Sequence, residues 1–315
     1  MPKVSIIIPV YNVEKYIKKC LESLAKQTMQ DFEVIIVNDG TKDNSEKVIL
    51  DYQENNPNMK IKYYKKENGG LASARNYGVK YAIGKYISFL DPDDYLDVNL
   101  YKNLEKYMDE NIDVIKFKMQ TIDTNGKIIE KLDGPVFEKC TGEEAFEKLC
   151  ANDKFIDPAC IYLYRRDFFV HNDFEYKLRY HEDFGLTPFI IIQAKSFVST
   201  NNYGYFYLQT EESLTRSKDI KKDKERAEDM LKHYDNMIQL IAVSKVAEKT
   251  KMLVKRYYTN SVILKANTLR GKEQKEYIKE IRKRKIYKNI IPNNLKQCIK
   301  RIILRISVKL YLKMR

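Results

Sequence analysis

Short runs of continuously apolar, β-branched residues alternate with helix-like stretches through about the first 120 residues of this chain. Residues 3–10 (KVSIIIPV) have no polar face, which is typical of a strand buried on both sides of a sheet. Residues 13–27 then repeat their apolar side chains at helical intervals. Residues 32–39, 60–66, 85–90 and 113–118 are predicted as further strands. This alternation predicts an α/β fold, with a mostly parallel sheet flanked by helices and right-handed crossovers.

The rest of the chain is less regular and then becomes helical in pattern. Residues 121–131 predict a hairpin with an Asn-Gly turn, and residues 196–209 predict a pair of strands. From about residue 219 to the end the pattern is helical. We therefore predict a sheet-containing domain over 1–215, made of the parts 1–118 and 119–215, and a helical C-terminal region over 216–315.

Polar side chains gather where the predicted strands end. Asn12 follows the first strand, Asp39 ends the second, and residues 91–94 follow the fourth. In parallel sheets, ligands bind outside the carboxyl ends of the strands, so these groups predict one shared ligand site. Asn12 and Asp39 offer donors and acceptors suited to a base or a ribose, whereas Asn12 and Asp43 are equally suited to helix capping.

Two carboxylates one residue apart, Asp91 and Asp93, follow the fourth predicted strand. Together with phosphate oxygens they suit a Mg²⁺ or Mn²⁺ ion, because both ions prefer oxygen ligands. The alternative is a polar turn at a strand end. Asp97, a little further on, is interpreted as the cap of the next helix.

A loop with two glycines opens the helix predicted at 71–82. Gly69 and Gly70 would let the backbone approach a ligand, and the start of a helix attracts anions. Arg75 lies one turn into that helix, where its fork could grip a phosphate. The alternative is a glycine-rich turn with an arginine on the surface.

Glu182 and Asp183 precede an apolar helix, in the segment HEDF at 181–184. Carboxylates at a helix start are ordinary capping residues. The functional alternative is a general base, which must be partly desolvated and still ionised at neutral pH.

Most of the net charge of +13 lies at the C-terminal end, where residues 271–315 hold 15 Lys and Arg against 3 Glu. Residues 295–313 can form a helix with an apolar stripe flanked by basic residues, which suits an anionic membrane surface. The alternative is packing on the rest of the chain or on a second subunit of a homo-oligomer. Nucleic-acid binding is disfavoured because no aromatic stacking platform accompanies the charge.

The five cysteines are odd in number and form no CxxC pair, which disfavours a disulfide framework or a zinc site and favours a reducing cytoplasm. The opening residues do not have the pattern of a secretory signal. No window of about 18 uninterrupted apolar residues occurs, so we predict no membrane-spanning helix. We expect a cytoplasmic protein.

Five motifs in this order resemble an inverting glycosyltransferase of family 2 with the GT-A fold. They are VSIIIPVYN, VIIVNDGTKDNS, ENGGLASARNYG, YISFLDPDD and HED, spread over about residues 3–215. The resemblance implies a bacterial enzyme of polysaccharide or capsule synthesis. The basic residues within 295–313 add the expectation that it is peripheral at the inner face of the plasma membrane. The resemblance also implies Mn²⁺ or Mg²⁺ as the cofactor, a UDP-sugar as the donor, and a glycan or polyprenyl-linked oligosaccharide as the acceptor.

The resemblance assigns nucleotide-sugar binding to Pro9, Tyr11, Asn12, Asp39, Gly70, Arg75, Asp91 and Asp94. Among these residues, Asp39 would accept a hydrogen bond from the base and Arg75 would approach the diphosphate. Asp94 would help to position the donor sugar.

The resemblance also implies a metal site and a catalytic base. Asp93 would bind the metal directly, with Asp91 as a second contact to the metal or the ribose. Asp183 would be the base, with Glu182 as the alternative, and a single displacement would invert the sugar. Leu208 and Thr210 depart from the family, because basic residues are expected there, and Arg216 is the candidate replacement. The rival functions are a non-catalytic assembly subunit and, within enzymes, a sugar-nucleotide pyrophosphorylase.

Overall fold

The computed structural model describes residues 1–151, 155, 158–210, 220–289, 298, 299, 302, 303 and 306. The chain divides into two compact units, Met1–Ser213 and Leu214–Arg315, and each is described by itself. The first unit carries the sheet, and the second is helical in its described part.

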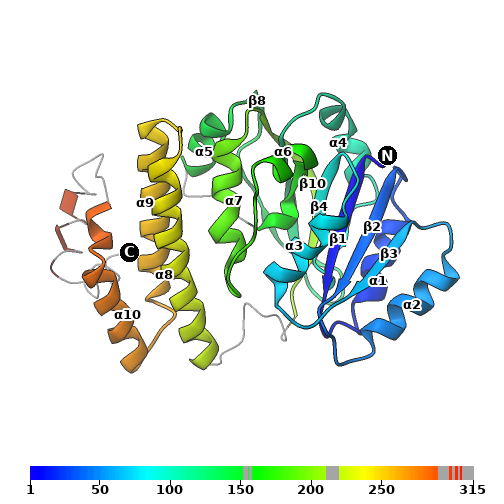
Figure 1. The fold of residues 1–315 in the computed structure, drawn as a ribbon, viewed down its shortest axis with the longest axis horizontal. Coiled ribbons are helices and arrows are strands. Elements are labelled where there is room, and N and C mark those ends of the chain that lie inside the picture. Colours follow the sequence, from blue (N-terminus) through cyan, green and yellow to red (C-terminus); the bar gives the residue numbers. More distant parts are fainter. Residues whose placement is uncertain are drawn as a thin grey trace. The chain divides into compact units, whose positions relative to one another are not determined.

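The first four predicted strands form a parallel set in the first unit. They are β1 (Val4–Val10), β2 (Phe32–Asn38), β3 (Ile61–Lys65) and β4 (Tyr86–Phe89). Their order in the sheet is β3-β2-β1-β4, and each neighbouring pair is parallel (Figure 1). Every residue of β1 and β2 is buried, as expected for strands covered on both faces. The predicted α/β fold with a mostly parallel sheet is therefore confirmed.

Helices connect these strands, as the apolar spacing predicts. They are α1 (Ile17–Ala25), α2 (Ser45–Asn55), α3 (Leu71–Tyr81) and α4 (Leu100–Asp109). Helix α3 packs closely on the sheet at Gly78, where an added Cβ would lie 2.4 Å from the Ile7 side chain. This close approach fixes which face of α3 points toward the sheet, and Arg75 lies on that buried face.

The second half of the sheet is mixed. It contains β5 (Tyr95–Leu96), β6 (Val114–Ile122), β7 (Ile128–Leu132), β8 (Phe137–Cys140), β9 (Tyr162–Arg165) and β10 (Phe197–Leu208). Strand β9 enters antiparallel between β4 and β6, and β10 is parallel to β6 and antiparallel to β5. The predicted hairpin is present, because β7 folds back antiparallel on β6.

The prediction of two strands over 196–209 was wrong. The segment is one long strand, β10, whose pairing with β6 shifts register between Ser199 and Tyr205. The chain bulges there instead of turning, so it continues along β6. Gly204 lies in this irregular stretch, where a Cβ would lie 2.1 Å from the Leu100 side chain.

The second half of the first unit also contains helices, the last of which begins at two of the predicted site residues. They are α5 (Gly142–Cys150), the short 3₁₀ helix η1 (Ala159–Ile161), α6 (Arg166–His171) and α7 (Glu182–Gln193). Eight residues of α7 are buried, and it begins directly at Glu182 and Asp183. His181, just before α7, has a positive φ of 57°, which turns the chain sharply into the helix.

The second unit contains α8 (Ile220–Val243), α9 (Glu248–Lys265), α10 (Gly271–Lys283) and the 3₁₀ helix η3 (Ile286–Asn289). The helical pattern predicted there is therefore confirmed up to residue 289. The amphipathic helix predicted over 295–313 lies almost wholly outside the described residues. Within the described part of the chain, no helix is long and apolar enough to span a membrane.

Candidate active site

Arg75 is the centre of the ionic network at the carboxyl end of the sheet. Its side chain is 1% exposed, and its Nη1 donates to Glu182 Oε1 at 2.9 Å and to Asp183 Oδ1 at 2.6 Å. Its Nη2 donates to Asp91 Oδ1 at 3.0 Å. Burial alone would lower the pKa of the guanidinium, but the three carboxylates outweigh burial and raise it. Arg75 therefore joins the end of β4 to the start of α7.

Two aromatic rings enclose the Arg75 guanidinium. Its central carbon lies 5.6 Å from the ring centroids of both Phe89 and Tyr176. Such rings attract a cation and exclude water around the ion pairs. The sequence predicts that Arg75 approaches a diphosphate. In the structure its guanidinium instead donates hydrogen bonds to three carboxylates and has almost no exposed surface. The reason is the helix register, since the α3 face that carries Arg75 points into the protein.

The carboxylates after β4 differ in their surroundings. Asp94 is buried, and its two oxygens accept hydrogen bonds from the Tyr205 hydroxyl at 2.6 Å and from the Leu208 backbone N–H at 2.8 Å. These bonds tie the turn to β10. Asp94 therefore anchors the turn to β10, and its contact with the donor sugar stays a prediction. Leu208, where a basic residue is expected, contributes its backbone N–H here.

Neither Asp93 nor Asp94 has a counter-ion among the described residues, but only Asp94 accepts hydrogen bonds from β10. Burial, followed by repulsion from Asp91, raises the pKa of Asp93 to about 6. Asp91 has one oxygen bonded to Arg75, and its side chain is partly exposed. Among the residues with described placement, no three His, Cys, Asp or Glu side chains cluster as a complete metal site. Two carboxylates that substrate oxygens would complete do fit Mg²⁺ or Mn²⁺, because such ions often take only one or two carboxylates from the protein.

The two candidate bases lie side by side in the first turn of α7. Both accept from the same nitrogen of Arg75, but the Asp183 side chain is 19% exposed and that of Glu182 is 9% exposed. Asp183 is therefore the carboxylate that an incoming hydroxyl reaches more easily. The structure thus brings Asp91, Glu182 and Asp183 together on one guanidinium, although they are far apart in the sequence.

Asp39 is held by the glycine loop. Its Oδ1 accepts from Lys66 Nζ at 2.6 Å and from the Gly69 N–H at 2.9 Å, and its Oδ2 accepts from the Gly70 N–H at 2.7 Å. Asp39 is buried, and both of its oxygens are used within the chain. The glycines thus bind a carboxylate of the protein itself, so a base that bonded to Asp39 would have to compete with this loop. Sequence reasoning missed Lys66, which stands directly before the loop in KKENGG.

The end of β1 presents one exposed aromatic ring. Pro9 is buried within β1, whereas Tyr11, two residues further along the chain, is exposed. Asn12 has a positive φ of 54°, and its Oδ1 accepts from the Lys42 N–H at 2.9 Å. Asn12 therefore joins the end of β1 to the loop after β2, and it is exposed like Tyr11, whereas Pro9 is buried.

Asp43 organises the loop after β2. It accepts hydrogen bonds from the hydroxyls of Thr41 and Ser45 and from the backbone N–H groups of Glu14 and Ser45. Burial would raise its pKa, but these bonds outweigh burial and lower the pKa to about 2. The bond to the first residue of α2 agrees with the capping alternative for this residue.

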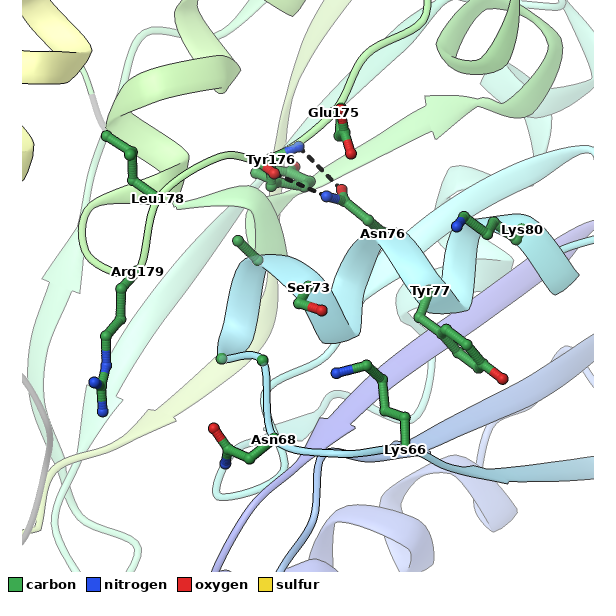
Figure 2. Close-up of a pocket in the computed structure, with 13 residues that line it drawn as sticks. Lys66, Asn68, Ser73, Asn76, Tyr77, Lys80, Glu175, Tyr176, Leu178 and Arg179 are labelled. Atoms are coloured by element: carbon green, nitrogen blue, oxygen red, sulfur yellow. Dashed lines mark hydrogen bonds between the residues drawn. The ribbon is translucent and has the colours of Figure 1, made fainter.

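A hollow of about 740 Å³ lies beside the glycine loop, on the outer face of α3 (Figure 2). Asn76 clamps the loop that leads to α7, because its side chain donates to the Tyr176 carbonyl at 2.8 Å and accepts from the Tyr176 N–H at 3.0 Å. Gly69 and Gly70, both singled out from the sequence, line this hollow. The lining residues that sequence reasoning missed include Asn68, Ser73, Asn76, Tyr77, Lys80 and Arg179.

The loop in which Arg216 was expected to act lies outside the described residues, as do its neighbours Ser213 and Thr215. The described part of β10 nevertheless reaches the turn after β4 through Leu208. The contacts of that loop with a ligand stay a prediction.

Several known proteins are similar to this chain. An "Uncharacterized glycosyltransferase EpsJ" of Bacillus subtilis is 35% identical over 224 residues, which are 68% of this chain and 63% of that protein. The "Minor teichoic acid biosynthesis protein GgaB" of the same organism is 31% identical over 70% of this chain and 24% of its own length. The chain thus spans less than two thirds of these relatives.

The fold also has a counterpart among solved structures. The crystal structure of S. aureus TarS 1–349 in complex with UDP-GlcNAc matches 99% of this chain and 89% of that chain, with a TM-score of 0.76 and 20% identity. This likeness supports the GT-A fold with a helical C-terminal region. Residues 5–171, more than half of the chain, match the family described as "Glycosyl transferase family 2". The chain is therefore a member of glycosyl transferase family 2.

Proposed function

We propose that this chain is a metal-dependent glycosyltransferase that moves a hexosyl or N-acetylhexosaminyl group from a UDP-sugar to an acceptor hydroxyl, with inversion. One observation carries the proposal: Arg75 binds Asp91 after β4 and Asp183 at the start of α7. Asp91, proposed to act on the donor, and Asp183, proposed to act on the acceptor, are thus hydrogen-bonded to the same guanidinium. Membership of family 2 and the glycosyltransferase names of its relatives support this activity, and neither rival function gains support from them.

The donor side rests on the carboxylates after β4. Asp91 and Asp93 would hold Mn²⁺ or Mg²⁺, which, when bound, stabilises the negative charge that develops on the departing diphosphate. Tyr11 is the exposed ring available to the base. TarS 1–349 of S. aureus has been solved with UDP and with UDP-GlcNAc, which supports a UDP-sugar as the donor here.

The acceptor side rests on Asp183. As general base it would take the proton of the acceptor hydroxyl while that oxygen attacks the anomeric carbon. Arg75 would hold the carboxylate in one orientation through the 2.6 Å hydrogen bond to its Oδ1. The Asn76 clamp on Tyr176 supports the same geometry, since it anchors the segment that leads into α7.

The acceptor is proposed to be a glycan or a lipid-linked oligosaccharide in the synthesis of a capsule or another surface polymer. The name of the relative GgaB, a teichoic acid biosynthesis protein, supports a surface polymer. We further propose that the enzyme works at the cytoplasmic face of the membrane, which it would reach through the basic residues within 295–313.

A panel of UDP-sugars, each incubated with the full chain and Mn²⁺, tests the proposal by the slow release of UDP. We expect one or a few donors to release UDP, and we expect EDTA or the change Asp93→Asn to abolish the release. Asp97→Asn is the matched control, because Asp97 follows in the same segment and its Oδ1 accepts from the Asn99 N–H. Full release in EDTA would remove the metal from the mechanism. If none of the UDP-sugars binds to the chain and none releases UDP, the proposed function is wrong.

A further inference from the structure

Strand β6 carries two buried lysines on one face. Lys116 is 1% exposed and Lys118 is 6% exposed. Residues two apart on a strand point to the same side, so their chains run in parallel away from the sheet. Neither residue belongs to the candidate active site, and the proposed function gives them no role.

The two lysines differ in their partners. Lys118 Nζ donates to Asp133 Oδ1 at 3.0 Å and to Asn201 Oδ1 at 2.7 Å, and it lies 4.9 Å from the centre of the Tyr203 ring. Lys116 Nζ makes no hydrogen bond or ion pair with the residues that the structure describes. A Cβ added to Gly134 would lie 3.3 Å from Lys116 Nζ, so this amine lies directly against the segment 133–135.

Among the described residues, positive charge exceeds negative charge around Lys116 and Lys118. Lys131 Nζ also lies near the Tyr203 ring, 5.4 Å from its centre, and Asp133 is the carboxylate that pairs with Lys118 among the described residues. Burial, and then repulsion from Lys118, lower the pKa of Lys116 to about 8. A buried charge without a partner is costly, and an anion placed between the two amines would offset that cost.

We propose that Lys116 and Lys118 form a binding site for a small oxyanion, a phosphate or carboxylate group, beneath the segment 133–135. Gly134, which has no side chain, lies directly against Lys116 Nζ, and the exposed Asp133 marks the side open to solvent. Two flexible amines suit such a group because each acts as a point charge with several donors. The site is independent of the proposed transfer reaction.

Thermal unfolding and calorimetric titration of the full chain test this site, with inorganic phosphate and acetate as the two probes at constant ionic strength. For the wild type, we expect a saturable rise in Tm and one bound anion per chain with at least one probe, because only the folded chain offers the site. The stronger probe tells a phosphate site from a carboxylate site. Lys116→Met should lose both effects, whereas Lys127→Met, on the exposed hairpin turn, should keep them.

Two further measurements distinguish loss of the anion site from misfolding of the variant. Without added anion, Lys116→Met should be at least as stable as the wild type, because it removes a buried charge that has no described partner. In the wild type, the stronger probe should slow acylation of Lys116, followed by mass spectrometry, and should leave Lys127 unaffected. An unchanged Tm of the wild type with both probes, or an equal rise in Lys116→Met, would overturn the site.

Discussion

The change Arg75→Met tests whether one buried guanidinium holds the candidate site together. In the wild type it makes three charge-assisted hydrogen bonds, to Asp91, Glu182 and Asp183. Methionine keeps much of the bulk and removes the charge, so three carboxylates would face one another without a cation. Removing one partner of a buried ion pair costs about 3–5 kcal/mol.

Where the loss of stability falls within about 3–5 kcal/mol depends on how exposed the three carboxylates are. The side chains of Asp91 and Asp183 are 29% and 19% exposed, so water can rehydrate them once the cation has gone. Glu182, at 9%, can rehydrate much less. We therefore expect the free energy of unfolding to fall by about 3 kcal/mol, near the lower limit, out of a total of about 5–15 kcal/mol for a typical protein.

Urea unfolding of the full chain, followed by circular dichroism, measures this loss. Arg166→Met is the matched control, because that guanidinium donates to the Gly84 carbonyl, and losing one such bond of a charged, partly exposed donor costs about 1.5 kcal/mol. Adding Glu182→Gln to Arg75→Met should restore part of the stability, since it removes the carboxylate that is hardest to rehydrate. An Arg75→Met variant as stable as the control, or no restoration in the double variant, would refute the idea that these charges depend on Arg75.

Three further predictions concern the proposed metal carboxylate, the proposed base and the C-terminal end. Because the folded-state pKa of Asp93 is raised to about 6, its ionised form destabilises the folded chain above that pH, and the cost vanishes below the ordinary value of 3.8. Asp93→Asn should thus stabilise the metal-free protein at pH 8 by about 1–3 kcal/mol and lose this gain near pH 4, as measured by urea unfolding in EDTA; a loss of stability at pH 8 would contradict this reasoning. Asp183→Asn should bind UDP-sugar in calorimetry nearly as tightly as the wild type but transfer the sugar about 10²-fold more slowly or worse; a normal transfer rate would move the base to Glu182 or elsewhere. Deletion from residue 293 onward should leave UDP release intact and abolish sedimentation with anionic vesicles, to which each nearby Lys or Arg contributes about 1 kcal/mol; full-length protein that ignores such vesicles at low salt would remove the membrane role.

Apolar pattern alone determined the layout of the first half of the sheet. The continuous runs that became β1 and β2 could be placed within a residue or so, because a strand covered on both faces allows no polar residue in its interior. The same pattern placed Asp39 and Asp91 at strand ends, and parallel strands bring such ends to one edge. The general location of the site therefore followed from local spacing.

Only the tertiary structure decided which polar groups meet. Arg75 lies 107 and 108 positions from Glu182 and Asp183, and Asp94 lies 111 from Tyr205, so no local spacing joins them. The antiparallel entry of β9 between β4 and β6 was also invisible in the pattern. Spacing reports which face of an element is buried, whereas the partner of a buried charge depends on strand order and helix register. For that reason the sequence predicted a phosphate contact for Arg75, and the fold surrounds it with carboxylates.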